Sequence, residues 1–184
     1  MQKLENIINL ILLNGVKKVI YISSTGVYGE VNREVTEADA PQPDTDSGKI
    51  LWEAELLFSA QTKFATAIVR FGGLIGPDRH PGRFFAGKTD IPNGLAPVNL
   101  IHLSDCIGIT KGIIEQNTFG IVFNACSPLH PTKDSFYTLM AQKANLPLPR
   151  FFNNLQGYKV VNSINLSKYL HYQFRFDNWD DYSF

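Results

Sequence analysis

Two helix-then-strand units near the start of the chain constrain its fold more than any other feature. Residues 3–14 place apolar side chains at helical spacing, and Gly15 follows where such a helix would end. Residues 16–23 (VKKVIYIS) form the apolar, β-branched run that a strand buried on both faces requires. Residues 48–63 and 66–71 repeat this order. Helices that alternate with buried strands predict an α/β fold with a doubly wound parallel sheet.

Shorter elements follow in the second half of the chain. Ser104 and Thr132 each stand at the start of a stretch with helical spacing, where hydroxyl side chains commonly cap helix N-termini. Strands are expected at residues 97–101, 120–124 and 159–163, and helices at 104–114, 132–144 and 166–170. The chain ends in aromatic residues that we expect to pack against the body of the protein: Tyr172, Phe174, Phe176, Trp179, Tyr182 and Phe184.

Composition argues against several classes of partner. Seventeen basic and seventeen acidic residues give a formal net charge of zero, so no long-range field attracts nucleic acid or an anionic membrane. The apolar stretch Ile7–Leu13 is far shorter than the roughly 20 residues of a membrane span. Residues 1–6 lack the pattern of a signal peptide. Cys106 and Cys126 form no CxxC pair, so we expect buried, reduced thiols in a cytoplasmic protein.

Three segments of the chain resemble motifs of one known family. Residues 21–29 (YISSTGVYG) resemble the SSxxVYG segment of the extended short-chain dehydrogenases/reductases, the NAD-dependent epimerase/dehydratase family. Residues 69–77 (VRFGGLIGP) are similar to that family's R-x-x-N-x-Y-G-P segment, and residues 99–105 (NLIHLSD) to its F-I-H-V-x-D segment. The overall pattern resembles an atypical branch, whose members keep the nucleotide-binding fold after their catalytic residues have been lost.

The resemblance implies a partial Rossmann-like fold in two regions. Residues 1–115 are expected to form the C-terminal half of an NAD(P)-binding domain, with an inserted substrate loop at about residues 77–97. Residues 116–184 are expected to form a small α+β region of the substrate-binding type that packs on it. The sequence contains no G-x-G-x-x-G loop, so we expect the half that would carry it to lie outside this chain. The implied cofactor is NAD or NADP, although the sequence of this chain alone contains no loop that would bind its pyrophosphate.

The resemblance also assigns roles to the residues that follow the buried strands. In the family, a serine of the SSxxVYG loop hydrogen-bonds the reacting oxygen of the substrate, and Ser24 matches it; a hydrogen bond to local backbone is the alternative role for this hydroxyl. Thr25, beside it, is expected to bind substrate. The glycines after the second buried strand would let the backbone pass close to a nicotinamide ring or to a neighbouring strand. The residues expected to bind the cofactor are Ser23, Phe71, Gly72, Gly73 and Leu74.

The family's acid/base pair, Tyr-x-x-x-Lys, has no match at the start of the following helix. In the family the tyrosinate transfers the proton, and the lysine lowers the pKa of the tyrosine and binds the nicotinamide ribose. An alignment on Gly48 and Glu55 places Ser47 at the tyrosine position. The same alignment places Leu51 at the lysine position.

A second alignment of this helix is possible, two residues earlier. It uses Glu53 as the reference and places Thr45 and Lys49 at the two catalytic positions. No alignment supplies a tyrosine, and the hydroxyl of serine or threonine is far too weak an acid to replace a phenol. Ser47 and Lys49 are therefore the catalytic candidates of this helix, and the ordinary redox mechanism is not expected.

The expected substrate-binding positions also depart from the family. Members that bind nucleotide sugars commonly use an asparagine and an arginine, and here Gly73 and Val98 take these places. The changes remove a donor and a positive charge that a diphosphate needs. Arg79 and Arg83, on the loop between them, are the candidates for substrate binding, with solvated surface cations as the alternative. The four histidines are scattered without the spacing of metal ligands, so no metal site is predicted.

Two functions are consistent with this pattern. The first is that of an NAD(P)-dependent epimerase/dehydratase-like protein that acts on a small molecule without the usual Tyr/Lys chemistry. The alternative is a non-catalytic nucleotide or metabolite sensor, or a partner subunit of the same fold, which the missing pair favours. A sheet that is cut at its middle exposes an unpaired edge, so we also expect self-association or a partner that completes the sheet.

Overall fold

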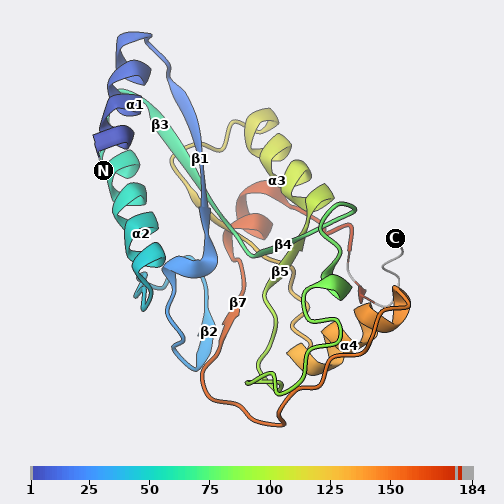
Figure 1. The fold of residues 1–184 in the computed structure, drawn as a ribbon. Helices are drawn as coiled ribbons and strands as arrows, with labels where there is room; N and C mark the ends of the chain where they lie inside the picture. Colours follow the sequence, from blue (N-terminus) through green and yellow to red (C-terminus); the bar gives the residue numbers. More distant parts are fainter. Residues whose placement is uncertain (1, 177, 180–184) are drawn as a thin grey trace.

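The computed structural model describes residues 2–176, 178 and 179 and is built around a parallel sheet (Figure 1). The sheet has the order β1–β3–β6, with strands at Lys18–Ser24, Ala65–Phe71 and Val122–Ala125. Parallel neighbours need a crossover between them, and α2 (Asp46–Ser59) supplies it for β1 and β3. The α/β fold with parallel strands that the sequence predicts is therefore confirmed.

Helices cover the two faces of this sheet, as Figure 1 shows. On one face, α1 (Gln2–Leu13) and α2 enclose a small core in which the rings of Tyr21 and Phe58 stack with centroids 4.7 Å apart. On the other face, α3 (Leu103–Glu115) packs on β3 and β6 and forms the largest core of the molecule. β3 is thus buried on both faces, which explains its nearly continuous apolar sequence, whereas β1 is only partly buried and its Ile22 is exposed.

Three further pairs of elements lie beside the carboxyl ends of the sheet. β2 (Arg33–Val35) pairs in parallel with β7 (Lys159–Val161), and β4 (Gly73–Ile75) pairs in parallel with β5 (Leu100–His102). α4 (Lys133–Lys143) packs its apolar face against β4, β5 and a short helical turn at Pro81–Arg83. β6 lies in the region predicted as C-terminal, yet it extends the same sheet as β1 and β3.

The helix ends confirm one predicted cap and correct another. Thr132 Oγ1 accepts a hydrogen bond from the backbone N–H of Ser135 at 3.2 Å, as expected for the cap of α4. The cap of α3 is His102, not Ser104, because His102 has extended backbone and its Nδ1 accepts from the N–H of Ser104 at 3.1 Å. The helix predicted to reach residue 63 ends at Ser59, since the chain must turn there to enter β3.

The aromatic tail packs against the body of the protein, as predicted for its described part. Tyr172 and Phe174 lie against the α3 core, and Phe176 and Trp179 lie against the α4 core. Tyr182 and Phe184 lie outside the described residues.

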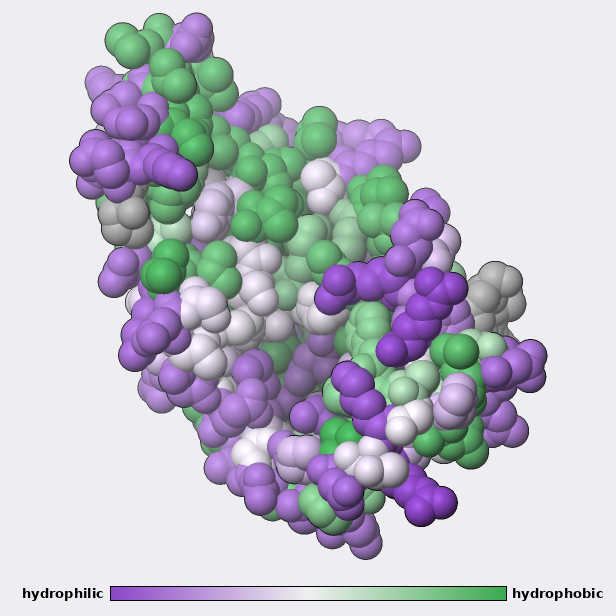
Figure 2. Space-filling model, viewed as in Figure 1, coloured by the Kyte–Doolittle hydropathy of each residue, from purple (hydrophilic) through white to green (hydrophobic). Residues whose placement is uncertain are grey.

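β1 is paired along one edge only, with β3, among the residues that the structure describes. Beside its free edge, an apolar hollow runs between β1 and α3, and we call it the β1–α3 groove. Its exposed apolar side chains are Ile22, Ile107 and Ile114, with Phe71 at its base. Figure 2 shows apolar atoms gathered over this part of the molecule. Such a contiguous patch is typical of a surface that another polypeptide covers.

No helix within residues 2–176 is long and apolar enough to cross a membrane. The same residues contain no cluster of three or more His, Cys, Asp or Glu side chains arranged to hold a metal ion.

The two cysteines are free and buried, as predicted. Burial raises the pKa of Cys106 to about 11 and that of Cys126 well above its usual range. With this pKa, only about a thousandth of Cys106 is ionised at pH 8, and the thiolate is the reactive species.

We expect neither thiol to react measurably with DTNB in the native chain, and both to react within minutes in guanidinium. Rapid reaction of the native protein at pH 8 would contradict this assignment.

Candidate functional site

The loop after β1 is held by one buried and one local hydrogen bond. Ser23 Oγ donates to Glu55 Oε1 of α2 at 2.6 Å, in a buried position. Ser24 Oγ accepts the N–H of Gly26 at 3.1 Å, which is the local bond named as the alternative role for this serine. This bond uses a lone pair, so the hydroxyl hydrogen of Ser24 can still donate to a ligand.

A buried ion pair between α2 and β3 also holds this loop in place. Arg70 of β3 donates to both carboxylate oxygens of Glu55, with Nη2 2.6 Å from Oε2, and its Nη1 lies 2.6 Å from Tyr28 Oη. Tyr28 Oη also lies 3.1 Å from Asn124 Oδ1. Burial raises the pKa of Tyr28, so its phenol stays protonated and serves as a structural link. Glu55, Arg70, Tyr28 and Asn124 thus join α2, β3, the loop and β6.

The start of α2 lies directly on the loop, and the geometry favours the alignment on Glu55. A Cβ atom on Gly48 would come within 2.5 Å of the Gly26 carbonyl oxygen, so only glycine permits this approach. Gly48 and Glu55 are both buried on the face toward the sheet, whereas Glu53 is exposed. Leu51 packs beside the apolar cluster of the loop.

The hydroxyl and amine candidates of α2 lie near solvent. Ser47 Oγ is 3.3 Å from Thr45 Oγ1, and Thr45 Oγ1 itself caps the helix by accepting the N–H of Gly48. Lys49 Nζ is 3.3 Å from Asp46 Oδ1, and 57% of the Lys49 side chain is exposed. Their assignment as catalytic residues remains a prediction.

The glycines after β3 pass close to a neighbouring strand, one of the two roles that the sequence left open. A Cβ atom on Gly72 would lie 2.9 Å from the Asn99 carbonyl oxygen, and the N–H of Gly73 donates to that same oxygen at 2.8 Å. Phe71 and Leu74 flank them and line an apolar hollow of about 250 Å3, which we call the Phe71 hollow. Phe71 lies opposite Ser24 in the register of the sheet.

A larger cavity of about 510 Å3 opens on Thr25 and Gly73, and we call it the polar cavity. Five segments that are far apart in sequence form its wall: the loop after β1, the start of β4, the approach to β5, the first two turns of α4, and the approach to β7. Its principal polar side chains are Thr25, Glu30, Asn99, Lys133, Tyr137 and Lys159. Ligands of open parallel sheets bind at the carboxyl ends of the strands, which is where this cavity lies.

Hydrogen bonds hold the wall of the polar cavity together. Lys159 Nζ pairs with Glu30 Oε1 at 2.8 Å. Asn99 Nδ2 donates to the Lys159 carbonyl oxygen at 2.8 Å, and Asn99 Oδ1 accepts the N–H of Val161 at 2.7 Å. Asn99 therefore contributes to the wall rather than to the free polar surface, since both ends of its amide are bonded.

The predicted substrate-binding residues lie in different places. Thr25 lines the polar cavity. Arg79 lies beside the Phe71 hollow, where its Nε donates to the Leu74 carbonyl oxygen at 2.9 Å. Arg83 is exposed at the end of the helical turn against which α4 packs. The cations that line the polar cavity are instead Lys133 and Lys159, which the sequence analysis did not select.

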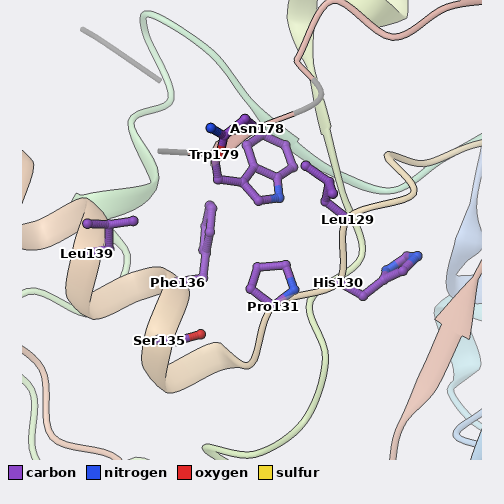
Figure 3. Close-up of a pocket in the computed structure, with 8 residues that line it drawn as sticks. All are labelled: Leu129, His130, Pro131, Ser135, Phe136, Leu139, Asn178 and Trp179. Carbon is purple, nitrogen blue, oxygen red and sulfur yellow. The ribbon is translucent and has the colours of Figure 1, made fainter. Parts of the chain in front are cut away.

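A third hollow, of about 360 Å3, lies between α4 and Trp179 (Figure 3). Phe136 and Trp179 form one side of it, with their ring centroids 5.5 Å apart. Two of its polar groups are already bonded, because Ser135 Oγ donates to the Thr132 carbonyl oxygen and the His130 ring contacts Val98 O and Asn162 Oδ1. Figure 3 shows the His130 ring directed away from the two aromatic rings. This hollow therefore belongs to the packing of the tail.

Known structures share this arrangement of strands and helices. A conserved protein of unknown function from Silicibacter pomeroyi superposes with a TM-score of 0.83 at 21% identity, over 96% of this chain and 68% of that one. MoeE5 in complex with UDP-glucuronic acid and NAD superposes with a TM-score of 0.79 at 18% identity, over 94% and 64%. UDP-glucuronic acid 4-epimerase from Bacillus cereus, in complex with NAD, gives 0.74 at 20% identity, over 89% and 58%.

The fold is that of NAD-dependent epimerase/dehydratase proteins. Protein YeeZ of Escherichia coli (strain K12) is 35% identical over 178 residues, which are 96% of this chain. The chain spans 65% of the length of YeeZ. No family model matches the sequence.

Proposed function

We propose that this chain is an NAD(P)-dependent epimerase/dehydratase-like protein that binds its small-molecule substrate in the polar cavity, with the nicotinamide in the Phe71 hollow. One observation carries the proposal: both spaces lie at the carboxyl ends of β1 and β3, where Ser24 and Phe71 are neighbours in the register. Neighbours of the same fold that were crystallised with NAD support this class of cofactor.

The Phe71 hollow suits the nicotinamide end of the dinucleotide. Phe71, Leu74 and Leu103 give it apolar walls against which a flat ring can pack. The bound dinucleotide supplies hydride transfer. Ser24 would donate its free hydroxyl hydrogen to the substrate oxygen. The phosphate-binding loop is proposed to come from residues other than these 184, since none of them forms a G-x-G-x-x-G.

Calorimetric titration with NADH and NADPH tests the cofactor, and reduced nicotinamide mononucleotide sharpens the test. Because these residues offer a binding site to the nicotinamide end of the dinucleotide and none to its pyrophosphate, we expect the mononucleotide to bind about as tightly as NADH, with a Kd of roughly 1 mM. Leu74→Asp should abolish the heat, whereas Leu56→Asp, at a similarly exposed leucine of α2, should not. No heat from any nicotinamide compound, or equal binding of AMP, would overturn the proposal.

The alternative function, a metabolite sensor without redox chemistry, is favoured by the surroundings of α2. Leu51 packs in an apolar cluster where the family has its lysine, and Lys49 is paired with Asp46 near solvent. Incubation with UDP-glucose and NAD, followed by chromatography of the sugar nucleotide, separates the two functions, because epimerisation and dehydration return the hydride to the sugar and leave no net NADH. Strong turnover of this sugar nucleotide would exclude the sensor.

We further propose that the β1 edge and the β1–α3 groove are covered in solution by a second copy of the chain or by a partner that completes the sheet. The unpaired edge of β1 and the exposed isoleucines beside it support this proposal.

A further inference from the structure

Among the polar side chains of the polar cavity that make no hydrogen bond or ion pair with any residue that the structure describes are Thr25, Lys133 and Tyr137. Thr25 is only 6% exposed and Tyr137 only 8%. Hydroxyl groups that are so deeply buried nearly always have a partner. Neither hydroxyl oxygen is sealed from solvent, so both remain available to a molecule inside the cavity.

Lys133 places an unbalanced positive charge at the same cavity. The other lining cation, Lys159, is already paired with Glu30. Lys133 is the first residue of α4, next to the cap Thr132, where the partial positive charge of the helix disfavours a cation. An anion at this position would be attracted both by the ammonium group and by the helix.

Tyr137 is held in place as a hydrogen-bond donor. Its ring packs edge-on against Phe85, with centroids 4.7 Å apart, and lies 5.1 Å from the ring of Phe136. Burial raises the pKa of Tyr137 to about 12, so the phenol keeps its proton throughout the physiological range. A fixed phenol can donate to a hydroxyl or carbonyl oxygen at little cost in conformational entropy.

We infer that the polar cavity binds a small hydroxylated molecule with one anionic group, a carboxylate or phosphate that contacts Lys133, and with hydroxyl groups that contact Thr25 and Tyr137. The inference rests on the proposed function, because it names the substrate class of the same cavity. A single unbalanced cation suits one anionic group rather than a diphosphate, and Val98 and Leu100 add apolar wall to the cavity.

Calorimetry with D-gluconate, D-glucose 1-phosphate and neutral D-glucose tests the inference, and the tighter of the two anions identifies the anionic group. Lys133→Gln removes a hydrogen bond to a charged group, so we expect it to weaken anion binding about tenfold or more and to leave the binding of glucose unchanged. Lys63→Gln, at an exposed lysine outside the cavity, is the matched control. Tyr137→Phe should weaken both anions about fivefold without a change in net charge.

Each result has a definite meaning. Glucose binding as tight as anion binding, an unchanged affinity in Lys133→Gln, or no heat from either anion up to about 20 mM would overturn the inference. Thermal melts of the variants show whether they are folded, and Lys133→Gln removes a cation from a helix N-terminus, which does not weaken α4. If gluconate binds and no nicotinamide compound does, the anion site stands and the proposed cofactor is ruled out. If a nicotinamide compound binds and neither anion does, the proposed cofactor stands and the anion site is ruled out.

Discussion

Glu55→Ala is expected to lower the free energy of unfolding by about 3–5 kcal/mol. The change leaves the guanidinium of Arg70, which is 3% exposed, without its carboxylate partner in the interior. Ser23 Oγ loses its acceptor as well. An uncompensated buried charge cannot recover its hydration, so the cost exceeds that of any single surface change. Urea unfolding followed by tryptophan fluorescence measures it, because Trp52 lies beside Arg70.

The chain offers a matched control two residues away. Glu53 is an exposed glutamate of the same helix, and Glu53→Ala should change the free energy of unfolding by no more than about 0.5 kcal/mol. Replacing both partners, by Glu55→Leu with Arg70→Met, should recover most of the loss, since apolar substitutes for a buried pair are often neutral. A loss below about 1 kcal/mol in Glu55→Ala would show that the pair is not structural.

Ile22→Lys is expected to convert a self-associated chain into a monomer. Ile22 lies on β1 in the β1–α3 groove and is 48% exposed. A lysine that is buried there without a partner costs about 2 kcal/mol or more, and a twofold interface contains the change twice. The sum, about 4 kcal/mol, corresponds to a roughly thousandfold weaker dimer. Light scattering over a concentration series measures the shift.

Ile50→Lys is the control for this experiment. Ile50 is an exposed isoleucine of α2, outside the groove, so its replacement should leave the association unchanged. If the unmodified chain is a monodisperse monomer at every concentration, self-association through the groove is excluded.

The sheet could be predicted from the sequence because its signal is local. β1 and β3 carry nearly continuous apolar runs, the composition typical of strands inside a parallel sheet, although only β3 is buried along most of its length in this structure. The cap of α3 could not be predicted in the same way. Both His102 and Ser104 can accept a hydrogen bond from the helix. Which of them caps α3 depends on the residue at which the extended backbone of β5 ends and the helix begins.

The site was less accessible to sequence reasoning than the sheet. Ser24 and Thr25 could be selected as candidates because they follow a recognisable strand, and their roles stay predictions. Lys133 and Tyr137 stand four residues apart on α4, and such spacing describes the face of any helix. They meet Thr25 only because five distant segments converge on one cavity. Charge alone selected Arg79 and Arg83, which do not line this cavity, and their role in substrate binding stays a prediction.

The pairing of β2 with β7 closes a very long loop of chain. Asn32 and Tyr158, which bond to each other beside this pair, are 126 residues apart. β1 and β3 need only the α2 crossover between them. Contacts at large sequence separation form late, because the entropy of closing the loop must be overcome before they contribute. We therefore expect the wall of the polar cavity to be the last part of the molecule to take shape, and the first to open under mild denaturation.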